Sequence, residues 1–349
     1  MARTPRRGAV RASIGDVARQ AGVSLGTVSN VLNRPERVSP TTREKVQAAI
    51  EELSFVPNGS ARQLRAGTIT TVGAVLLDIA NPFFTEVARG VEDRLAQDDH
   101  MLMLASSDED PAREARYLRL FEEHGVLGLL VTPATADVDH LLDLHARGVE
   151  VVLLDRPSPS PELASVAVDD VAGGAMAVEH LLDLGHRRIA FINGPASIRQ
   201  CVDRRAGAVA ALEDAGLDPA EALVEVTVPF LNAEGGERGA NQLLAQAGGR
   251  DRPTALFCVN DLTALGAMRT LRWVHGLDIP RDIAVVGYDD VDFASMLTTP
   301  LTSVRQPTRR LGSVAADLLL RSRAGEPAPD AQRQVLFQPE LVVRASSGA

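Results

Sequence analysis

The sequence has few cysteines and no segment that could cross a membrane. Its 349 residues include two cysteines, Cys201 and Cys258, with no CxxC pair and no metal-ligand spacing. This excludes a disulfide scaffold, and we expect reduced thiols in a cytoplasmic protein. No apolar run approaches the roughly 18 residues that span a bilayer, and residues 1–13 lack the apolar stretch of a signal peptide.

Catalytic motifs are missing as well. No GxSxG, P-loop, HExxH or GxGxxG motif stands between a strand-like and a helix-like segment, and Gly235, Gly236 and Gly239 only begin a helix. The seven histidines show no metal-ligand spacing. The sequence therefore predicts a protein that is not an enzyme and that has no metal site and no cofactor.

Charge is divided unevenly along the chain. The protein has 36 basic and 46 acidic side chains and a formal net charge of −10, which by itself argues against a nucleic-acid partner. Residues 1–66, however, carry 11 basic and 5 acidic groups, a charge of +6, whereas the remaining residues carry 25 basic and 41 acidic groups, a charge of −16. The length predicts two or three domains, so we expect a small basic N-terminal domain followed by a large acidic region.

The basic N-terminal region has the pattern of three short helices at residues 13–56, preceded by a basic arm at residues 1–12 that we expect to be disordered. The first helix begins at Ser13, the second covers residues 24–33 and the third begins at Ser39. The outer face of the second helix is polar but uncharged, which suits a helix in the major groove of DNA. A helical packing module is the alternative, and the charge distribution favours DNA.

Residues 57–68 are predicted to form a hinge after this domain. Asn58 can cap a further helix that is too short to be stable alone. Leu64 is its one large apolar side chain, and arginines flank it. The segment is either a flexible basic linker or a hinge helix that folds on DNA and inserts Leu64 into the minor groove.

Residues 14–33, IGDVARQAGVSLGTVSNVLN, resemble the helix-turn-helix of the lactose-repressor (LacI/GalR) family of bacterial transcription regulators. The resemblance continues along the chain at residues 81–84 (NPFF), 184–191 (LGHRRIAF), 260–261 (ND) and 286–290 (VGYDD). Each segment is weak alone, but their order and spacing over most of the chain make the match specific.

The C-terminal region alternates strand-like and helix-like segments, which predicts parallel sheets covered by helices on both faces. Strands are expected at residues 72–77, 101–105, 127–131, 149–154, 189–192, 255–259 and 283–286, and helices at residues 84–96, 111–124, 171–184 and 204–215. The resemblance implies a two-lobed α/β effector-binding and dimerisation domain at residues 69–349, like the periplasmic binding proteins. Lobe one would cover about 69–167 and 306–335, and lobe two about 168–305 and 336–349.

Two such lobes place a ligand site between the carboxyl ends of their strands. The residues that follow strands and match the family's effector site are Asn81, Phe83, Asp155, Asn260 and Asp289. Asp155 and Asp289 would accept hydrogen bonds from sugar hydroxyls, Asn260 would bridge, and Phe83 would stack or pack. The alternative is that such Asp and Asn residues only form turns and cap helices.

Two departures from the family pattern bear on the ligand. Arg204 matches the second of two family arginines, but the first falls on Val202. Arg199 lies nearby and is either a substitute or an ordinary surface arginine. Leu231 stands where the lactose repressor has a tryptophan, so the effector need not be a simple neutral sugar.

The resemblance also assigns DNA contacts. Leu25, Gly26 and Asn30 occupy base-reading positions, where Leu25 would pack on a thymine methyl group, Asn30 would bond adenine and Gly26 would allow close approach. The other expected contacts, most of them to phosphate, are Ser24, Thr27, Ser29, Asn33, Ser39 and Thr42, with Asn58, Ala61 and Leu64 in the hinge.

Together these features predict a ligand-responsive transcriptional regulator in the cytoplasm. We expect a homodimer, since the chain lacks the leucine-heptad tail of the tetrameric lactose repressor, on a pseudo-palindromic double-stranded DNA operator. Its partner ligand would be a small-molecule effector, a sugar or sugar derivative, and its target a sugar or carbon-metabolism operon that it represses; no membrane is involved. The alternative is a cytoplasmic sugar-binding protein with a vestigial DNA-binding domain.

Overall fold

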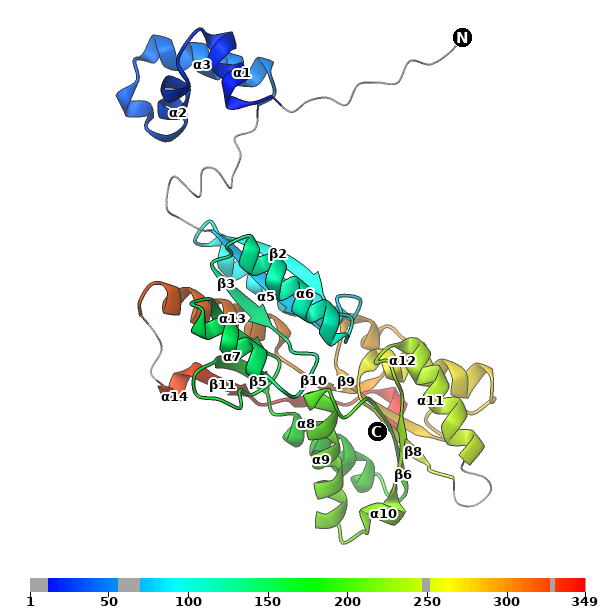
Figure 1. Ribbon diagram of the computed structural model, residues 1–349. Helices are drawn as coiled ribbons and strands as arrows, with labels where there is room; N and C mark the ends of the chain where they lie inside the picture. The colour runs from blue at the N-terminus through cyan, green and yellow to red at the C-terminus, as the bar shows by residue number, and fades with distance from the viewer. Residues whose placement is uncertain (1–11, 56–69, 247–251, 327–329, 349) are drawn as a thin grey trace, which may run out of the picture. The chain divides into compact units, whose positions relative to one another are not determined.

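A computed structural model describes residues 12–55, 70–246, 252–326 and 330–348 of the chain. The polypeptide divides into two compact units, residues 1–69 and 70–349 (Figure 1). We call the described part of the first unit, residues 12–55, the head, and the second unit the body. Within the described residues, no helix is both long and apolar enough to cross a membrane.

Local capping sets the ends of the helices in the head. The elements are α1 (Ile14–Ala21), α2 (Leu25–Asn33), the short 3-10 helix η1 (Pro35–Arg37) and α3 (Pro40–Glu52). Ser13 forms a capping box with Asp16 at the start of α1, and Gly22 ends α1 in the left-handed conformation at φ +66°. Ser24 and Ser39 accept hydrogen bonds at the starts of α2 and α3. The structure thus forms a helix-turn-helix as predicted.

One apolar stripe from each helix makes the core of the head. Val17, Val28 and Val46, one from each α-helix, are fully buried, and Phe55 closes the cluster after α3. Because each stripe uses positions three or four residues apart, the opposite faces of the helices remain in solvent.

The body contains two six-stranded sheets. The first has the order β11-β5-β4-β3-β1-β2 and is parallel throughout. The second has the order β12-β10-β9-β8-β6-β7 and is parallel except for its edge strand β12. The first sheet comprises β1 (Thr71–Leu76), β2 (Met101–Ser106), β3 (Gly128–Val131), β4 (Glu150–Leu154), β5 (Ala164–Val168) and β11 (Gln334–Phe337). The second comprises β6 (Ile189–Asn193), β7 (Leu223–Thr227), β8 (Ala255–Cys258), β9 (Ala284–Asp289), β10 (Thr302–Arg305) and β12 (Glu340–Val342).

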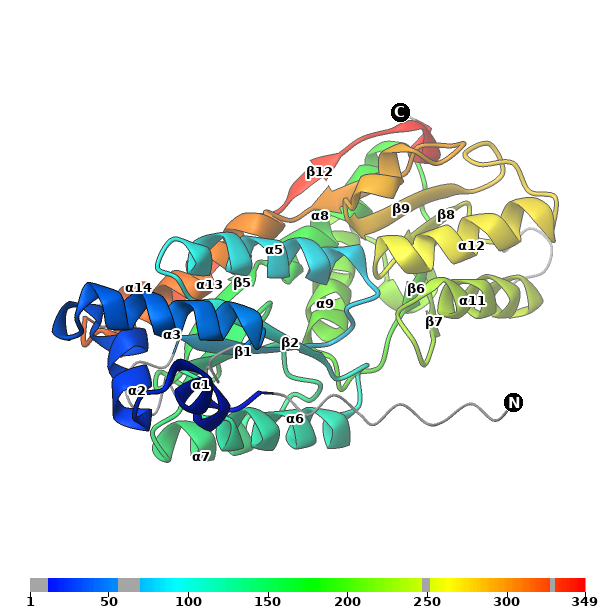
Figure 2. The ribbon, with the colours of Figure 1, turned by 90° about the horizontal axis from the view of Figure 1, so that it is seen from above.

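Helices cover both faces of each sheet, as Figures 1 and 2 show. Lobe one, built on the first sheet, has α5 (Pro82–Ala96), α6 (Pro111–Glu123), α7 (Asp139–Ala146), α13 (Thr308–Arg323) and α14 (Asp330–Arg333). Lobe two, built on the second, has α8 (Asp170–Asp183), α9 (Arg199–Asp214), α10 (Pro219–Ala222), α11 (Ala233–Gln246), α12 (Asp261–Trp273), η3 (Asp292–Ser295) and η4 (Ala345–Ser347). Successive strand residues enter different cores, since Leu129 and Val131 pack on one face of β3 and Leu130 on the other. The predicted α/β body with parallel sheets is confirmed.

Three helix pairs in the body pack backbone against backbone. At each crossing, a glycine of one helix lies against a backbone carbonyl of the other, and the arrangement is reciprocal. A Cβ atom at any of these glycines would overlap the facing oxygen. The pairs are Gly90 and Gly312 between α5 and α13, Gly174 and Gly207 between α8 and α9, and Gly236 and Gly266 between α11 and α12.

The chain passes between the two lobes three times, from β5 to α8, from β10 to α13 and from β11 to β12. The first and third crossings are joined, because the amide of Asp169 donates to the carbonyl of Phe337 at 2.9 Å. Gln306, on the second crossing, donates from Nε2 to Oδ1 of Asp289 at 2.8 Å.

Candidate nucleic-acid interface and ligand cleft

The second helix of the head presents its polar side to solvent. Leu25 is 56% exposed, and Gly26 and Asn30 are exposed, whereas Val28 and Val31 face the core. The three predicted base-reading residues therefore share the accessible side of a helix that is fixed on its other side. Such a face can enter a major groove without unfolding.

Two Ser-x-x-Thr hydroxyl pairs mark the starts of α2 and α3. Ser24 accepts from the Thr27 amide at 3.1 Å, and the two hydroxyl oxygens are 2.9 Å apart. Ser39 accepts from the Thr42 amide at 3.4 Å, and those hydroxyls are 2.8 Å apart. Two hydroxyls share one hydrogen bond, so each pair keeps one O–H that can donate to a phosphate at a helix N-terminus. Residues 22–26, GVSLG, have the letters of GxSxG, but they join two helices and the serine is a cap.

The remaining predicted DNA contacts divide into two groups. Asn33, at the end of α2, donates from Nδ2 to the carbonyl of Ser29 at 2.8 Å and lies 3.3 Å from its hydroxyl. Asn58, Ala61 and Leu64 of the predicted hinge lie outside the described residues.

A narrow cavity lies at the carboxyl ends of strands from both lobes. Its free volume is about 40 Å³, which holds a few water molecules and not a sugar. A sugar can therefore enter only when the lobes or their side chains move. The residues around it are Leu77, Asp78, Asn81, Phe83, Phe84, Glu109, Asp155, Ile198, Gln200, Arg204, Leu231, Asn260 and Asp289.

Five of the six residues predicted to bind an effector line this cavity: Asn81, Phe83, Asp155, Asn260 and Asp289. Asn81 caps α5 through Oδ1 and donates from Nδ2 to Asp289 at 3.4 Å. Asn260 caps α12 through Oδ1 and donates from Nδ2 to the carbonyl of Leu231 at 2.9 Å. Capping and a place in the cavity are thus combined in the same asparagines.

Arg199 does not line the cavity. Its side chain is 50% exposed, and its Nε lies 2.8 Å from a carboxylate oxygen of Asp203 on the same helix. Val202 is also partly exposed. The structure instead brings the neighbouring Gln200 to the cavity, because one step along a helix rotates a side chain by about 100°.

Among the described residues that line the cavity, Arg204 is the one basic side chain, and it is buried. Its Nε donates to Oδ1 of Asp170 at 2.8 Å, and its Nη1 donates to the carbonyl of Val259 at 2.6 Å. The guanidinium carbon lies 3.6 Å from the centre of the Tyr288 ring. The close packing of α8 on α9 makes the pair with Asp170 possible.

Asp155 lies directly after β4 with a positive φ of 60°. Gln200 donates from Nε2 to its carbonyl at 2.6 Å and to its Oδ2 at 2.8 Å. Burial raises the pKa of Asp155 well above its usual value; Asp170 and Asp289 raise it further, while Arg204 and Gln200 oppose the shift.

Asp289, the last residue of β9, also has a positive φ, 108°. Its carboxylate accepts from Asn81 and Gln306 and lies 4.0 Å from Nη1 of Arg204. Burial raises the pKa of Asp289 to about 6, although Arg204 and these hydrogen bonds oppose the shift.

Glu109, in the loop after β2, is a further acidic residue of the cavity and is not among the predicted site residues. Burial raises its pKa to about 7, Asp78 and Asp108 raise it further, and a hydrogen bond with the Leu231 backbone opposes the shift. In the part of the chain that the structure describes, no group of three His, Cys, Asp or Glu side chains could hold a metal ion.

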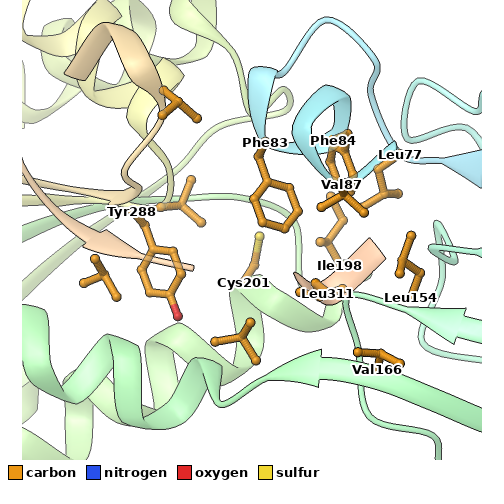
Figure 3. Close-up of a cluster of buried hydrophobic side chains, with 14 of the residues drawn as sticks. Leu77, Phe83, Phe84, Val87, Leu154, Val166, Ile198, Cys201, Tyr288 and Leu311 are labelled. Carbon is orange, nitrogen blue, oxygen red and sulfur yellow. The ribbon is translucent and has the colours of Figure 1, made fainter. Parts of the chain in front are cut away.

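Aromatic and aliphatic side chains pack beside these polar groups. Figure 3 shows Phe83 from the start of α5 and Tyr288 from β9 in one buried cluster with Ile198 and Cys201. Phe83 is 2% exposed, and its ring lies 4.9 Å from the ring of Phe84 in an edge-to-face arrangement. The cavity therefore combines an apolar wall with hydrogen-bonding groups, which is typical of small-molecule sites.

Known proteins share both units of this chain. Residues 13–58 match the family of bacterial regulatory proteins called lacI, and residues 178–347 match the periplasmic binding protein-like domain. The chain is 36% identical to the HTH-type transcriptional repressor PurR of Photobacterium profundum, over 96% of this chain and 98% of that protein. It is 33% identical to the HTH-type transcriptional regulator DegA of Bacillus subtilis, over 97% and 98% respectively.

Solved structures agree with these relatives. A lac repressor dimer bound to operator and the anti-inducer ONPF matches with a TM-score of 0.79 and 30% identity, over 97% of this chain and 100% of that one. The complex of the transcriptional regulator CelR with cellobiose matches with a TM-score of 0.69 and 33% identity, over 96% and 100%. A regulator from Enterococcus faecium with bound ribose matches with a TM-score of 0.70 and 29% identity, over 79% and 98%. This chain therefore belongs to the LacI family of bacterial regulatory proteins and is a DNA-binding transcriptional regulator, not an enzyme.

Proposed function

We propose that the protein is a ligand-responsive repressor of a sugar or carbon-metabolism operon. The observation that carries this proposal is the exposed face of α2, where Leu25, Gly26 and Asn30 stand on a capped helix of a basic domain. An acidic body with a hydrogen-bonding cavity supports the response to a small molecule.

On DNA, a homodimer places two heads on the half-sites of a pseudo-palindromic operator. Leu25 packs on a thymine methyl group, Asn30 bonds adenine, and the Ser24–Thr27 and Ser39–Thr42 pairs donate to phosphates. The lac repressor structure, a dimer on its operator, supports this arrangement by similarity. The protein acts in the cytoplasm, where operators are found.

In the body, an effector binds Asn81, Phe83, Asp155, Asn260 and Asp289, with Gln200 and Arg204 beside them. Binding separates the lobes or rearranges them, because the cavity is too small for a sugar as it stands. The related CelR and Enterococcus faecium structures contain cellobiose and ribose, which supports a sugar-like effector.

Selection of binding sites from random duplex DNA, followed by footprinting, tests the DNA-binding role. We expect a symmetric site, and we expect Asn30→Ala to lower affinity for it about 10-fold to 100-fold, as for the loss of a bidentate base contact. Gln47→Ala, an exposed amide on α3 outside the proposed contacts, is the matched control. No saturable specific site would contradict the proposal.

Salt dependence and the hinge give a second test. The slope of log affinity against log salt should reflect the basic groups of residues 1–66 in two subunits, since the acidic body repels DNA.

Leu64→Ala should weaken specific binding more than non-specific binding, because it removes an apolar wedge and no charge. Equal losses on both DNAs would argue for a flexible linker.

A thermal-shift screen of sugars, sugar derivatives, nucleosides and polyols tests the effector site. A ligand at a hundredfold excess over its Kd adds about 2.7 kcal/mol to the stability of the body. Tight ligand binding without any affinity for DNA would favour the alternative, a sugar-binding protein with a vestigial head.

A further inference from the structure

Carboxyl groups outnumber basic groups around the cavity. Asp78, Glu109, Asp155 and Asp289 line it, and Arg204 is the one basic side chain among its lining residues. This excess is not a surface effect, because Asp155 and Asp289 are 3% and 4% exposed. Buried carboxylates normally have a cation or several donors as partners.

Arg204 cannot balance this excess. Its Nε donates to Asp170, a buried carboxylate that does not line the cavity, at 2.8 Å. The two charges form a closed pair under the ring of Tyr288, and a further donor of Arg204 is used by the carbonyl of Val259. Arg204 therefore pairs closely with Asp170 and reaches Asp289 only at 4.0 Å, and no other basic side chain among the described residues lines the cavity.

Asp155 shows this most clearly. Its Oδ2 accepts from Gln200, but its Oδ1 is buried and, among the described residues, has no hydrogen-bond partner. Arg156 follows it in the chain, yet the guanidinium of Arg156 turns to the carbonyls of Thr135 and Ala136 at 2.8 and 3.1 Å. Oδ1 of Asp155 thus lies buried at the cavity without a hydrogen-bond partner among the described residues.

Glu109 is another carboxyl group that lines the cavity. Glu109 faces Asp78 and Asp108, and the nearby Arg113 is paired with Asp108. The same glutamate lines the open groove beside the cavity. Among the described residues, no basic side chain forms a salt bridge with Glu109.

The side-chain amides of the cavity already donate to the protein. Nδ2 of Asn81 donates to Asp289, Nε2 of Gln200 to Asp155, and Nδ2 of Asn260 to the carbonyl of Leu231. Asn81 and Asn260 each keep one N–H, but the four lining carboxyl groups offer a larger number of acceptor oxygens. A ligand rich in donors fits such a wall, and a ligand with a phosphate or carboxylate does not.

We propose that the effector is a hydroxylated amine, such as an amino sugar or imino sugar, whose ammonium group binds Oδ1 of Asp155. This inference rests on the proposed function, since it takes the cavity as the effector site. Hydroxyls of the same molecule donate to Asp289 and Glu109. An organic cation fits rather than a metal ion, because the described residues contain no cluster that could hold a metal. Anionic sugar derivatives are rejected by the unpaired carboxylates.

Binding of the ammonium group is coupled to the loss of a proton from the Asp155 carboxyl group. Burial and neighbouring carboxylates raise the pKa of Asp155, with Asp170 and Asp289 acting in one direction and Arg204 and Gln200 in the other. A bound ammonium group favours the ionised carboxylate, so binding releases protons. While the amine of the ligand stays protonated, affinity for it should therefore rise with pH, and affinity for its neutral counterpart should not.

Calorimetric titration of the full chain with matched probes tests the proposal. The cationic series is D-glucosamine, D-galactosamine, D-mannosamine and 1-deoxynojirimycin; the neutral series is D-glucose, D-galactose and D-mannose; the anionic series is D-glucuronate and D-glucose 6-phosphate. We expect a cationic member to bind at least about tenfold more tightly than its neutral counterpart, as for a charge-assisted hydrogen bond. Asp155→Asn should reduce this ratio to near one, whereas Asp214→Asn, an exposed carboxylate on α9, should leave it unchanged.

Each outcome is decisive. If Asp155→Asn does not fold, the rise of cationic affinity with pH in the natural chain and a reduced ratio in Glu109→Gln decide the matter. Equal or tighter binding of the neutral or anionic member would overturn the assignment of an amine and leave the proposed regulator in place. No saturable binding of any series, by protein that still binds its operator, would overturn both the amine and the sugar-like effector and leave the DNA-binding role.

Discussion

The head and the body place their functional groups in opposite environments. In the head, Leu25 and Asn30 stand in solvent on a helix whose ends are fixed by caps within three or four residues. In the body, Asp155, Arg204 and Asp289 are buried, and their side-chain contacts join residues 17 to 208 positions apart in the chain. The head presents a surface made by local rules, whereas the site in the body exists only when the whole unit is folded.

This difference separates stability from function in one unit and couples them in the other. A substitution on the exposed face of α2 changes what the head can bind and leaves its core intact. A substitution at the cavity removes a partner from a buried charge and so acts on folding and on ligand binding together. Predictions on the two units should therefore differ in kind.

Glycine substitutions give the largest expected contrast. Gly207→Ala places a methyl group against the carbonyl of Val171, so α8 and α9 move apart and Arg204 loses Asp170. We expect the body to lose about 2–4 kcal/mol. Near-UV circular dichroism during denaturation measures this, since the one tryptophan and both tyrosines belong to the body.

Gly26→Ala in the head is the matched control. Its new methyl group would lie 3.7 Å from Oγ of Ser24, an ordinary contact, so the head should gain about 0.5–1 kcal/mol of helix stability. A body that tolerates Gly207→Ala as easily would contradict the close packing of these helices.

The pH dependence of stability should have opposite signs in the two units. The pKa of Glu109 is raised to about 7, so its contribution is present below about pH 4.5 and is lost as the pH rises to 7. Glu109→Gln should remove this loss and stabilise the body by about 1–3 kcal/mol at pH 8 relative to the natural chain. Chemical denaturation at pH 5 and pH 8 measures the change, with the exposed Glu213→Gln as control.

In the head, the corresponding sign is reversed. Hydrogen bonds from Ser13 lower the pKa of Asp16, so its contribution is present at neutral pH and is lost as the pH falls through that lowered value. Parallel pH profiles for the head and the body would remove this part of the contrast.

Loss of a cap should act on the head alone. Ser24→Ala removes the acceptor of the Thr27 amide, and we expect α2 to lose about 1 kcal/mol. Hydrogen exchange of the α2 amides in the full chain measures the effect, and Thr41→Ala, an exposed threonine on α3, is the control. Faster exchange in the body as well would show that the two units unfold together.

The smallest effect on stability is expected at Leu25. Because its side chain is 56% exposed, Leu25→Ala should change the stability of the head by less than about 0.5 kcal/mol while weakening operator binding several-fold. The same substitution at the fully buried Leu154 should cost the body about 2–5 kcal/mol. A large loss of head stability in Leu25→Ala would place that residue in the core.

The same division explains what could be predicted from the sequence. The starts of the three head helices follow from Ser13, Ser24 and Ser39, because a cap is a contact between residues two or three positions apart. The seven strands expected in the body are all present, but β5, β7, β10, β11 and β12 were not expected. β12 has three residues and β11 is partly exposed, so neither has a long apolar run to mark it.

At the cavity, Asp155, Asn260 and Asp289 are selectable because they follow recognisable strands. Gln200 is not, since its orientation depends on how α9 is rotated against the cleft. The adjacent Arg199, predicted as a possible substitute for the arginine that Val202 replaces, points away from the cavity. Glu109 depends on a loop in which its own φ is +62°, a conformation fixed by tertiary contacts and not by local preference.

The reciprocal glycine crossings have a mechanical consequence. Each crossing holds two helices in direct backbone contact, so we expect each of three pairs to move as a rigid unit: α5 with α13, α8 with α9, and α11 with α12. Compliance is then concentrated where the chain passes between the lobes, near Asp169, Gln306 and Gln338. Gln306 lies on one of these connections and donates a hydrogen bond to the Asp289 carboxylate, so a displacement of Asp289 in the cavity acts directly on a connection between the lobes.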